Sequence, residues 1–114
     1  MHERIIDANL NRLREGLRVI EDICRFGLDD AVLGARLKKA RHGVQALREA
    51  FPAGDLLDAR DSIGDVGRSR IKEPDRREGL QQVLGAAFGR AQESLRALEE
   101  MAKLERPAAA RSAK

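Results

Sequence analysis

Hydrophobic residues recur along the chain in alternating steps of three and four positions, the spacing of one face of an α-helix. Three stretches carry this pattern, and they cover residues 6–24, 33–51 and 80–102. Gly27, Pro52 and Pro107 follow the three stretches, and helices commonly end at such residues. The pattern therefore predicts an all-α protein, built as a bundle of three long helices.

Residues that favour helix starts precede the second and third stretches. Asp29 and Asp30 can cap the second helix and place negative charge at its positive end. Pro74 can occupy the first turn of the third helix, where its missing N–H has no intrahelical partner to lose. Both features agree with the boundaries that the apolar pattern predicts.

The apolar stripes are wider than one helix partner requires. In the first helix, Ile5, Val19 and Ile23 extend the stripe to one side. A face of this width can bury more than one partner. We therefore expect a homo-oligomer.

The connection between the second and third helices is unusually long. More than twenty residues run from Pro52 to Glu73, and links of this length in a bundle are usually functional or disordered. Ile63, Val66 and Ile71 argue against simple disorder. We expect a long functional loop, and a flexible connector that merely packs these three apolar residues is the alternative.

A segment of the first predicted helix returns in the third. Residues 8–25 and 86–103 align without a gap at an offset of 78 positions. Six aligned pairs are identical: Ala8 and Ala86, Arg12 and Arg90, Glu15 and Glu93, Leu17 and Leu95, Arg18 and Arg96, Glu21 and Glu99. Two copies of so specific a helix suggest a pseudo-symmetric pair that frames one site.

Each copy of the repeat places an arginine on a mostly apolar strip. At 100° per residue, Arg12 lies on the same side of its helix as Ile5, and Arg90 holds the matching position in the third helix. Either arginine could reach past the strip to water or pair with a buried acid. The alternative is an anion site, because a fixed guanidinium fork suits phosphate and the neighbouring Gly16 or Ser94 leaves room for it.

Composition and charge narrow the classes of function. A chain of 114 residues with 42 % hydrophobic and 36 % charged residues fits one domain with a core. The net charge of +3 belongs to residues 106–114, which hold three of the 22 basic residues and none of the 19 acidic ones. We therefore expect a neutral helical domain over residues 1–105 and a basic flexible tail over residues 106–114. A neutral body without Trp or Tyr argues against nucleic-acid binding.

Cysteine content and hydropathy indicate the compartment. A single cysteine, Cys24, excludes an intramolecular disulfide and gives no metal cluster. The first residues lack the apolar core of a signal peptide, and no apolar run is long enough to span a bilayer. We expect a cytoplasmic protein with no membrane partner.

The long connection holds the residue types that phosphoryl transfer uses. Cations can clamp phosphate oxygens, carboxylates can hold Mg²⁺, and glycines allow close approach of the backbone. The residues concerned are Arg60, Asp61, Ser62, Gly64, Asp65 and Gly67. The chain has no G-x-x-x-x-G-K-[ST] motif, which excludes a P-loop.

Four segments together resemble one protein family. They are I-D-A-N-L-N-R-L-R-E-G-L-R-V-I-E-D at 6–22, L-K-K-A-R-H at 37–42, A-R-D-S-I-G-D-V-G at 59–67 and R-A-Q-E-S-L-R-A-L-E-E at 90–100. In order and spacing they resemble the small helical hydroxymethylpyrimidine-phosphate kinases of thiamine biosynthesis, over about residues 4–105. That domain occurs alone or fused ahead of thiamine-phosphate synthase, so a separate synthase is an expected partner. The chain departs from the family at Ala87, where the second copy tends to carry an asparagine that matches Asn9.

The resemblance implies a reaction. The γ-phosphate of ATP would pass to 4-amino-5-hydroxymethyl-2-methylpyrimidine phosphate and yield the diphosphate, with Mg²⁺ as the metal. A non-catalytic helical scaffold for a separate thiamine-phosphate synthase is the alternative, and it would leave the Arg-Asp-Ser-rich connection without a role.

We combine the reaction with the residues as follows. Arg12, Arg60 and Arg90 would hold the two phosphates, and orientation and charge would supply most of the catalysis because the acceptor oxygen is already ionised. The catalytic candidates are therefore Arg12, Arg60, Asp61 and Arg90, and the Mg²⁺ candidates are Asp61 and Asp65. Further substrate-binding candidates are Asn9, Arg41, His42, Ser62, Gly64, Gly67 and Glu93. A lone histidine on a helix is usually structural, so His42 could contribute only if it faces the same cavity as Arg12.

Overall fold

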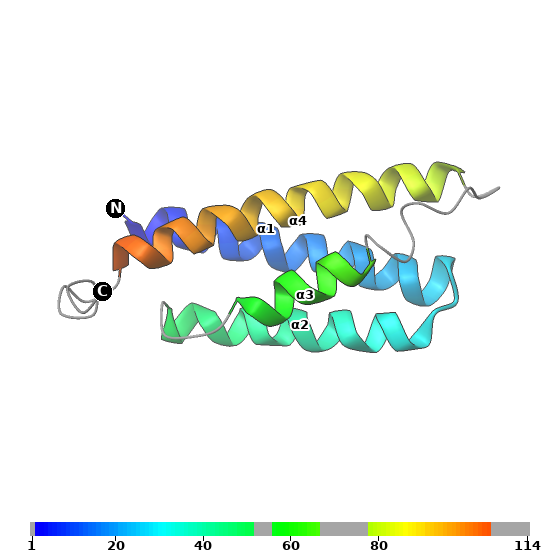
Figure 1. Ribbon diagram of the computed structural model, residues 1–114, viewed down its shortest axis with the longest axis horizontal. Coiled ribbons are helices and arrows are strands. Elements are labelled where there is room, and N and C mark those ends of the chain that lie inside the picture. The colour runs from blue at the N-terminus through cyan, green and yellow to red at the C-terminus, as the bar shows by residue number, and fades with distance from the viewer. Residues whose placement is uncertain (1, 52–55, 67–77, 106–114) are drawn as a thin grey trace.

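The computed structural model describes residues 2–51, 56–66 and 78–105 (Figure 1). The helices follow in the order α1 (His2–Asp22), η1 (Ile23–Gly27, a single π-helical turn), α2 (Ala31–Ala50), α3 (Leu57–Val66) and α4 (Glu78–Glu105). The described residues contain no strand, so the all-α prediction is confirmed. The helices α1, α2 and α4 correspond to the three predicted stretches. The predicted tail, residues 106–114, lies outside the described residues.

The long helices run alongside one another (Figure 1). Helix α1 packs mainly against α4 and α2, and α3 packs against α2 and α4. The start of α1 and the end of α4 lie at the same end of the bundle, so these two helices are antiparallel. The two copies of the sequence repeat are therefore direct neighbours.

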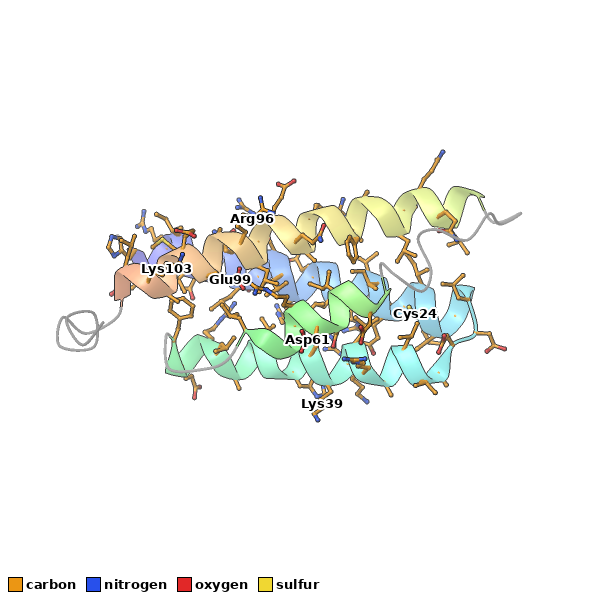
Figure 2. The ribbon with its side chains drawn as sticks, viewed as in Figure 1. Cys24, Lys39, Asp61, Arg96, Glu99 and Lys103 are labelled. Carbon is orange, nitrogen blue, oxygen red and sulfur yellow. The ribbon has the colours of Figure 1, made fainter. Side chains whose placement is uncertain are left out.

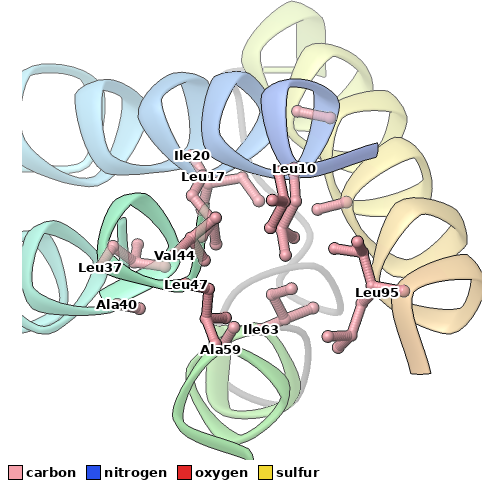
Figure 3. Close-up of a cluster of buried hydrophobic side chains, with 14 of the residues drawn as sticks. Leu10, Leu17, Ile20, Leu37, Ala40, Val44, Leu47, Ala59, Ile63 and Leu95 are labelled. Atoms are coloured by element: carbon pink, nitrogen blue, oxygen red, sulfur yellow. The ribbon is translucent and has the colours of Figure 1, made fainter. Parts of the chain in front are cut away.

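The predicted apolar stripes meet in one core (Figure 3). Five of the six residues of the first stripe, from Leu10 in α1 to Cys24 in η1, are almost completely buried. Burial of one leucine or isoleucine side chain stabilises the folded state by about 1.5–3 kcal/mol, so this stripe fixes which way α1 faces. Figure 3 labels Leu10, Leu17 and Ile20 from α1, Leu37, Ala40, Val44 and Leu47 from α2, Ala59 and Ile63 from α3, and Leu95 from α4.

The turn between α1 and α2 is closed by backbone and capping bonds. The Asp30 amide donates to the Cys24 carbonyl at 2.6 Å. Asp29 adopts a left-handed conformation with φ 54°, which aspartate tolerates better than most residues other than glycine. The Asp30 carboxylate accepts a hydrogen bond from the Leu33 amide at 3.0 Å, so the predicted N-cap of the second helix is confirmed.

The prediction of a long loop between the second and third long helices is wrong for residues 57–66, which form α3. Ala59 and Ile63 lie one helical turn apart and are 3 % and 2 % exposed, so α3 adds a fourth side to the core. A helix of ten residues is marginal alone and depends on such packing. Gly64 lies within this helix, whereas Gly67, Ile71 and Pro74 lie outside the described residues.

A very close approach of α1 and α4 occurs at Gly16. A Cβ atom at this position would lie 3.2 Å from the Ala91 Cβ and 3.4 Å from the Ala87 carbonyl oxygen. A larger side chain would therefore push α4 away from α1. The small size of Gly16 serves helix packing here, in addition to any room that it leaves for a ligand.

None of the helices over the described residues is long and apolar enough to cross a membrane.

Candidate functional site

A hollow of about 480 Å³ lies between the two copies of the repeat. Its volume falls in the range of about 300–1,000 Å³ that is typical of small-molecule sites. It is lined by Asn9, Arg12, Glu15, Gly16 and Val19 from α1, and by Arg90, Glu93 and Ser94 from α4. The hollow therefore joins residues that are far apart in the sequence but equivalent in the repeat.

The hollow has a pseudo-twofold arrangement. Two equivalent helices packed antiparallel are related by a local twofold axis that passes between them. Three equivalent pairs line the hollow: Arg12 with Arg90, Glu15 with Glu93, and Gly16 with Ser94. Asn9 lines it without its counterpart, because Ala87 is fully buried beneath Gly16. The two halves of the site thus share their charges and differ in one amide.

Arg12 and Arg90 are not paired within the described part of the chain. Both side chains are exposed at the hollow, and neither guanidinium forms a hydrogen bond or ion pair with another described residue. Arg41 and Arg60, by contrast, each pair with a glutamate. The two arginines of the repeat are thus available to an anionic ligand.

The floor of the hollow is polar and buried. Asn9 and Ser94 are nearly inaccessible, and the Asn9 Nδ2 donates to the Ile5 carbonyl at 2.9 Å. This bond orients the amide and leaves its oxygen as an acceptor. Ile5 and its repeat equivalent Val83 are apolar residues that remain 43 % and 50 % exposed. They belong to the wide apolar faces from which a homo-oligomer was expected, and that oligomer stays a prediction.

The structure places Arg60 away from this hollow. Arg60 lies on α3 and forms an ion pair with Glu99 of α4. Together with Gly64 it lines a separate hollow of about 330 Å³ between α3 and α4. The prediction that Arg60 would hold the phosphates together with Arg12 and Arg90 therefore does not agree with its position.

Asp61, Ser62 and Asp65 lie on the side of α3 that faces α2. Asp65 forms an ion pair with Arg36 of α2. Asp61 and Ser62 line a hollow of about 200 Å³ with Arg36 and Lys39. Figure 2 labels Asp61 on α3 and Lys39 on α2. Of the two carboxylates predicted to hold Mg²⁺, Asp65 is thus paired with an arginine, and Asp61 shares a hollow with two cations. Among the described residues, no three His, Cys, Asp or Glu side chains are grouped to bind a metal ion.

The two candidates on α2 have different surroundings. Arg41 donates from Nε to the buried Glu21 carboxylate at 2.9 Å, so it links α2 to α1. His42 is exposed and is not among the residues that line the α1–α4 hollow. The condition for a ligand role of His42, a shared cavity with Arg12, is therefore not met.

Glu15 and Ser94 line the hollow but were not among the residues predicted to form the site. Glu15 was identified only as part of the repeat, and Ser94 only as a small residue that leaves room beside Arg90. The repeat itself carried the missing signal, because Glu93 was a candidate and Glu15 is its equivalent.

Comparison with known proteins places the chain in a family. Residues 4–114 match the ThiD2 family. A protein from Nostoc punctiforme named thiamine-phosphate synthase is 44 % identical to this chain, and the match covers 97 % of this chain and 31 % of that protein. A protein of the same name from Thermosynechococcus vestitus is 47 % identical, and the match covers 89 % of this chain and 28 % of that protein. A third, from Rhodopirellula baltica, is 42 % identical, covering 88 % and 27 %. The chain thus spans less than a third of each of these relatives, and no solved structure matches it. With nearly its whole length matched, the chain belongs to the ThiD2 family.

Proposed function

We propose that this protein acts in thiamine biosynthesis and transfers the γ-phosphate of ATP to 4-amino-5-hydroxymethyl-2-methylpyrimidine phosphate. The observation that carries the proposal is the pair of arginines, Arg12 and Arg90, at equivalent positions of one hollow and without partners among the described residues. Relatives named thiamine-phosphate synthase, of which this chain spans under a third, support the pathway. The sequence resemblance to hydroxymethylpyrimidine-phosphate kinases supports the reaction.

The α1–α4 hollow offers complementary groups for such a substrate. The monophosphate would bind between Arg12 and Arg90, since guanidinium groups pair with phosphate through two parallel hydrogen bonds. The ring would lie toward Val19, an apolar lining residue. The side-chain oxygen of Asn9, whose Nδ2 already donates to the Ile5 carbonyl, would accept a hydrogen bond from the 4-amino group.

Two carboxylates in the hollow fit Mg²⁺. Glu15 and Glu93 both line it, and neither is paired with another described residue. Mg²⁺ is usually bound by one or two carboxylates together with substrate phosphates and water. Asp65 fits less well because it already pairs with Arg36, and Asp61 lines a different hollow from Arg12 and Arg90. Bound Mg²⁺ would neutralise charge on the phosphoryl group in transfer.

Transfer requires little covalent chemistry from the protein. An oxygen of the pyrimidine monophosphate attacks the γ-phosphorus, the new P–O bond forms, and the bond to the β–γ bridging oxygen breaks, so ADP leaves. The attacking oxygen is ionised, and no proton has to be removed from it. Arg12 and Arg90 would offset repulsion between the two anions and hold them in line, and both effects lower the barrier.

The experiment is a turnover assay with the purified chain. ATP, Mg²⁺ and the pyrimidine monophosphate should yield the pyrimidine diphosphate and ADP in equal amounts, as measured by chromatography. Omission of the pyrimidine substrate should abolish ADP formation, because the acceptor is that phosphate rather than water. Co-purification with a thiamine-phosphate synthase and no turnover of ATP would instead support the scaffold function and overturn the kinase proposal.

A further inference from the structure

A second cation-lined hollow lies beside the first along α1, where α1 meets α2. It measures about 320 Å³ and is lined by Arg14, Glu15, Arg18, Val19 and Arg41. Three arginines and one glutamate give it an excess of positive charge. We propose that this α1–α2 hollow binds the polyphosphate of the nucleotide that donates the phosphoryl group, an inference that rests on the proposed kinase function.

Arg41 is held in a fixed position at this hollow. Its side chain is 14 % exposed, and its Nε donates to Glu21, which is 2 % exposed. A guanidinium has five N–H donors, and this bond uses one of them. No other described residue accepts from Arg41, so its terminal nitrogens remain available at the hollow. A preorganised arginine of this kind loses less entropy when it binds phosphate.

The proposal also gives the buried Arg41–Glu21 ion pair a function, which is to orient the Arg41 guanidinium. An ion pair removed from water contributes little net stability, because the cost of desolvation offsets the attraction. The same pair orients a guanidinium well for a ligand. Positioning of Arg41 therefore explains the buried carboxylate better than stability does.

The repeat supplies an internal comparison. The equivalent hollow on α4, against α3, contains Arg96 in place of Arg18 but Gln92 in place of Arg14. Its arginine from the neighbouring helix, Arg60, pairs with Glu99, a lining residue of that same hollow. Arg41 likewise pairs with Glu21, the equivalent of Glu99, so the difference between the two hollows is the number of arginines: three at the α1–α2 hollow and two at the α3–α4 hollow. This asymmetry favours the α1–α2 hollow for a polyanion.

The position of the hollow suits transfer between two phosphorylated substrates. The α1–α2 and α1–α4 hollows share Glu15 and Val19 as lining residues. A nucleotide in the first would therefore end next to a monophosphate in the second. Phosphoryl transfer needs this adjacency, because donor and acceptor oxygens must lie in line about the γ-phosphorus.

Equilibrium binding of a non-hydrolysable ATP analogue, the β,γ-imido triphosphate with Mg²⁺, tests the proposal by titration calorimetry. Replacing Arg14 and Arg18 together by alanine should raise the dissociation constant at least tenfold, because two charge-assisted contacts are lost. Binding of the pyrimidine monophosphate should change less than threefold. Arg96→Ala is the matched control on the other copy, and it should leave nucleotide affinity unchanged within twofold.

The outcomes of these experiments distinguish loss of the proposed site from unfolding of the variant and from failure of the kinase proposal. Arg18 has an exposed side chain whose contact with Asp22 is long, at 3.9 Å, so its loss should not unfold the protein. Nucleotide affinity that is unchanged in the folded double variant, or lowered equally by Arg96→Ala, would overturn the proposed site. If the unaltered chain makes diphosphate but the double variant keeps its KM for ATP, the site is wrong and the kinase function stands. If the unaltered chain makes no diphosphate, the kinase function fails, and the binding titration still decides whether the hollow takes a triphosphate.

Discussion

Replacing Arg12 by alanine should lower kcat/KM for the pyrimidine monophosphate about 100-fold, and Arg90→Ala should have an effect of similar size. Each substitution removes one guanidinium from a hollow in which two anions must approach each other. Loss of one preorganised charge contact at a reacting group commonly costs a factor of about 10²–10³ in rate. Initial rates over a range of substrate concentrations, with ATP saturating, measure the effect.

Arginine-to-lysine variants sharpen this prediction. Lysine keeps the charge but loses the two-pronged fork, so Arg12→Lys should recover only part of the activity. Arg96→Ala serves again as the control, because Arg96 lies on the same helix as Arg90 but lines a different hollow. Full activity in Arg12→Ala would exclude this residue from phosphate binding, and a loss of similar size in Arg96→Ala would point to a general effect of charge.

Glu21→Ala should lower the free energy of unfolding by roughly 3 kcal/mol. Glu21 is almost fully buried and pairs with Arg41 and, at 3.4 Å, with Arg25. Its removal leaves the largely buried Arg41 without a counter-charge, and breaking a buried pair in this way costs about 3–5 kcal/mol. Urea denaturation followed by circular dichroism measures the change through the shift of the transition midpoint.

The repeat again provides the control. Glu99 is the equivalent of Glu21 and also pairs with an arginine, but its side chain is 26 % exposed and that of Arg60 is 57 % exposed. Exposed pairs contribute at most about 1 kcal/mol, so Glu99→Ala should cost less than this. Equal losses in the two variants would contradict the explanation from burial.

Long helices with regular stripes could be predicted from the sequence, and α3 could not. The three long helices repeat their apolar spacing over several turns, and Leu13, Leu17 and Ile20 are buried as that spacing requires. Helix α3 spans only ten residues, and its apolar steps from Ala59 to Ile63 and Val66 lie beside a glycine and three aspartates. Its helical state depends on packing against α2 and α4, and that contribution is not visible in a local pattern.

The part of the candidate site that lies on the two copies of the repeat could be predicted from the sequence. Arg12, Arg90, Asn9 and Glu93 were candidates from the repeat and its resemblance, and the structure brings all four to one hollow. The candidates from the long connection lie elsewhere, because ion pairs such as Arg36–Asp65 and Arg60–Glu99 hold them. Ion-pair partners that are about thirty to forty positions apart cannot be recognised from local spacing. The charged residues 60–65 were therefore interpreted as a ligand site.

We expect the pyrimidine monophosphate to bind between the two copies of the repeat. Amide chemical shifts of ¹⁵N-labelled protein, recorded during titration with this compound, test it most directly because they locate the ligand without any need for turnover. The largest shifts should fall on α1 and α4, near Arg12, Gly16, Arg90 and Ser94. Shifts that gather on α3 around residues 60–64, with α1 and α4 unchanged, would contradict this expectation.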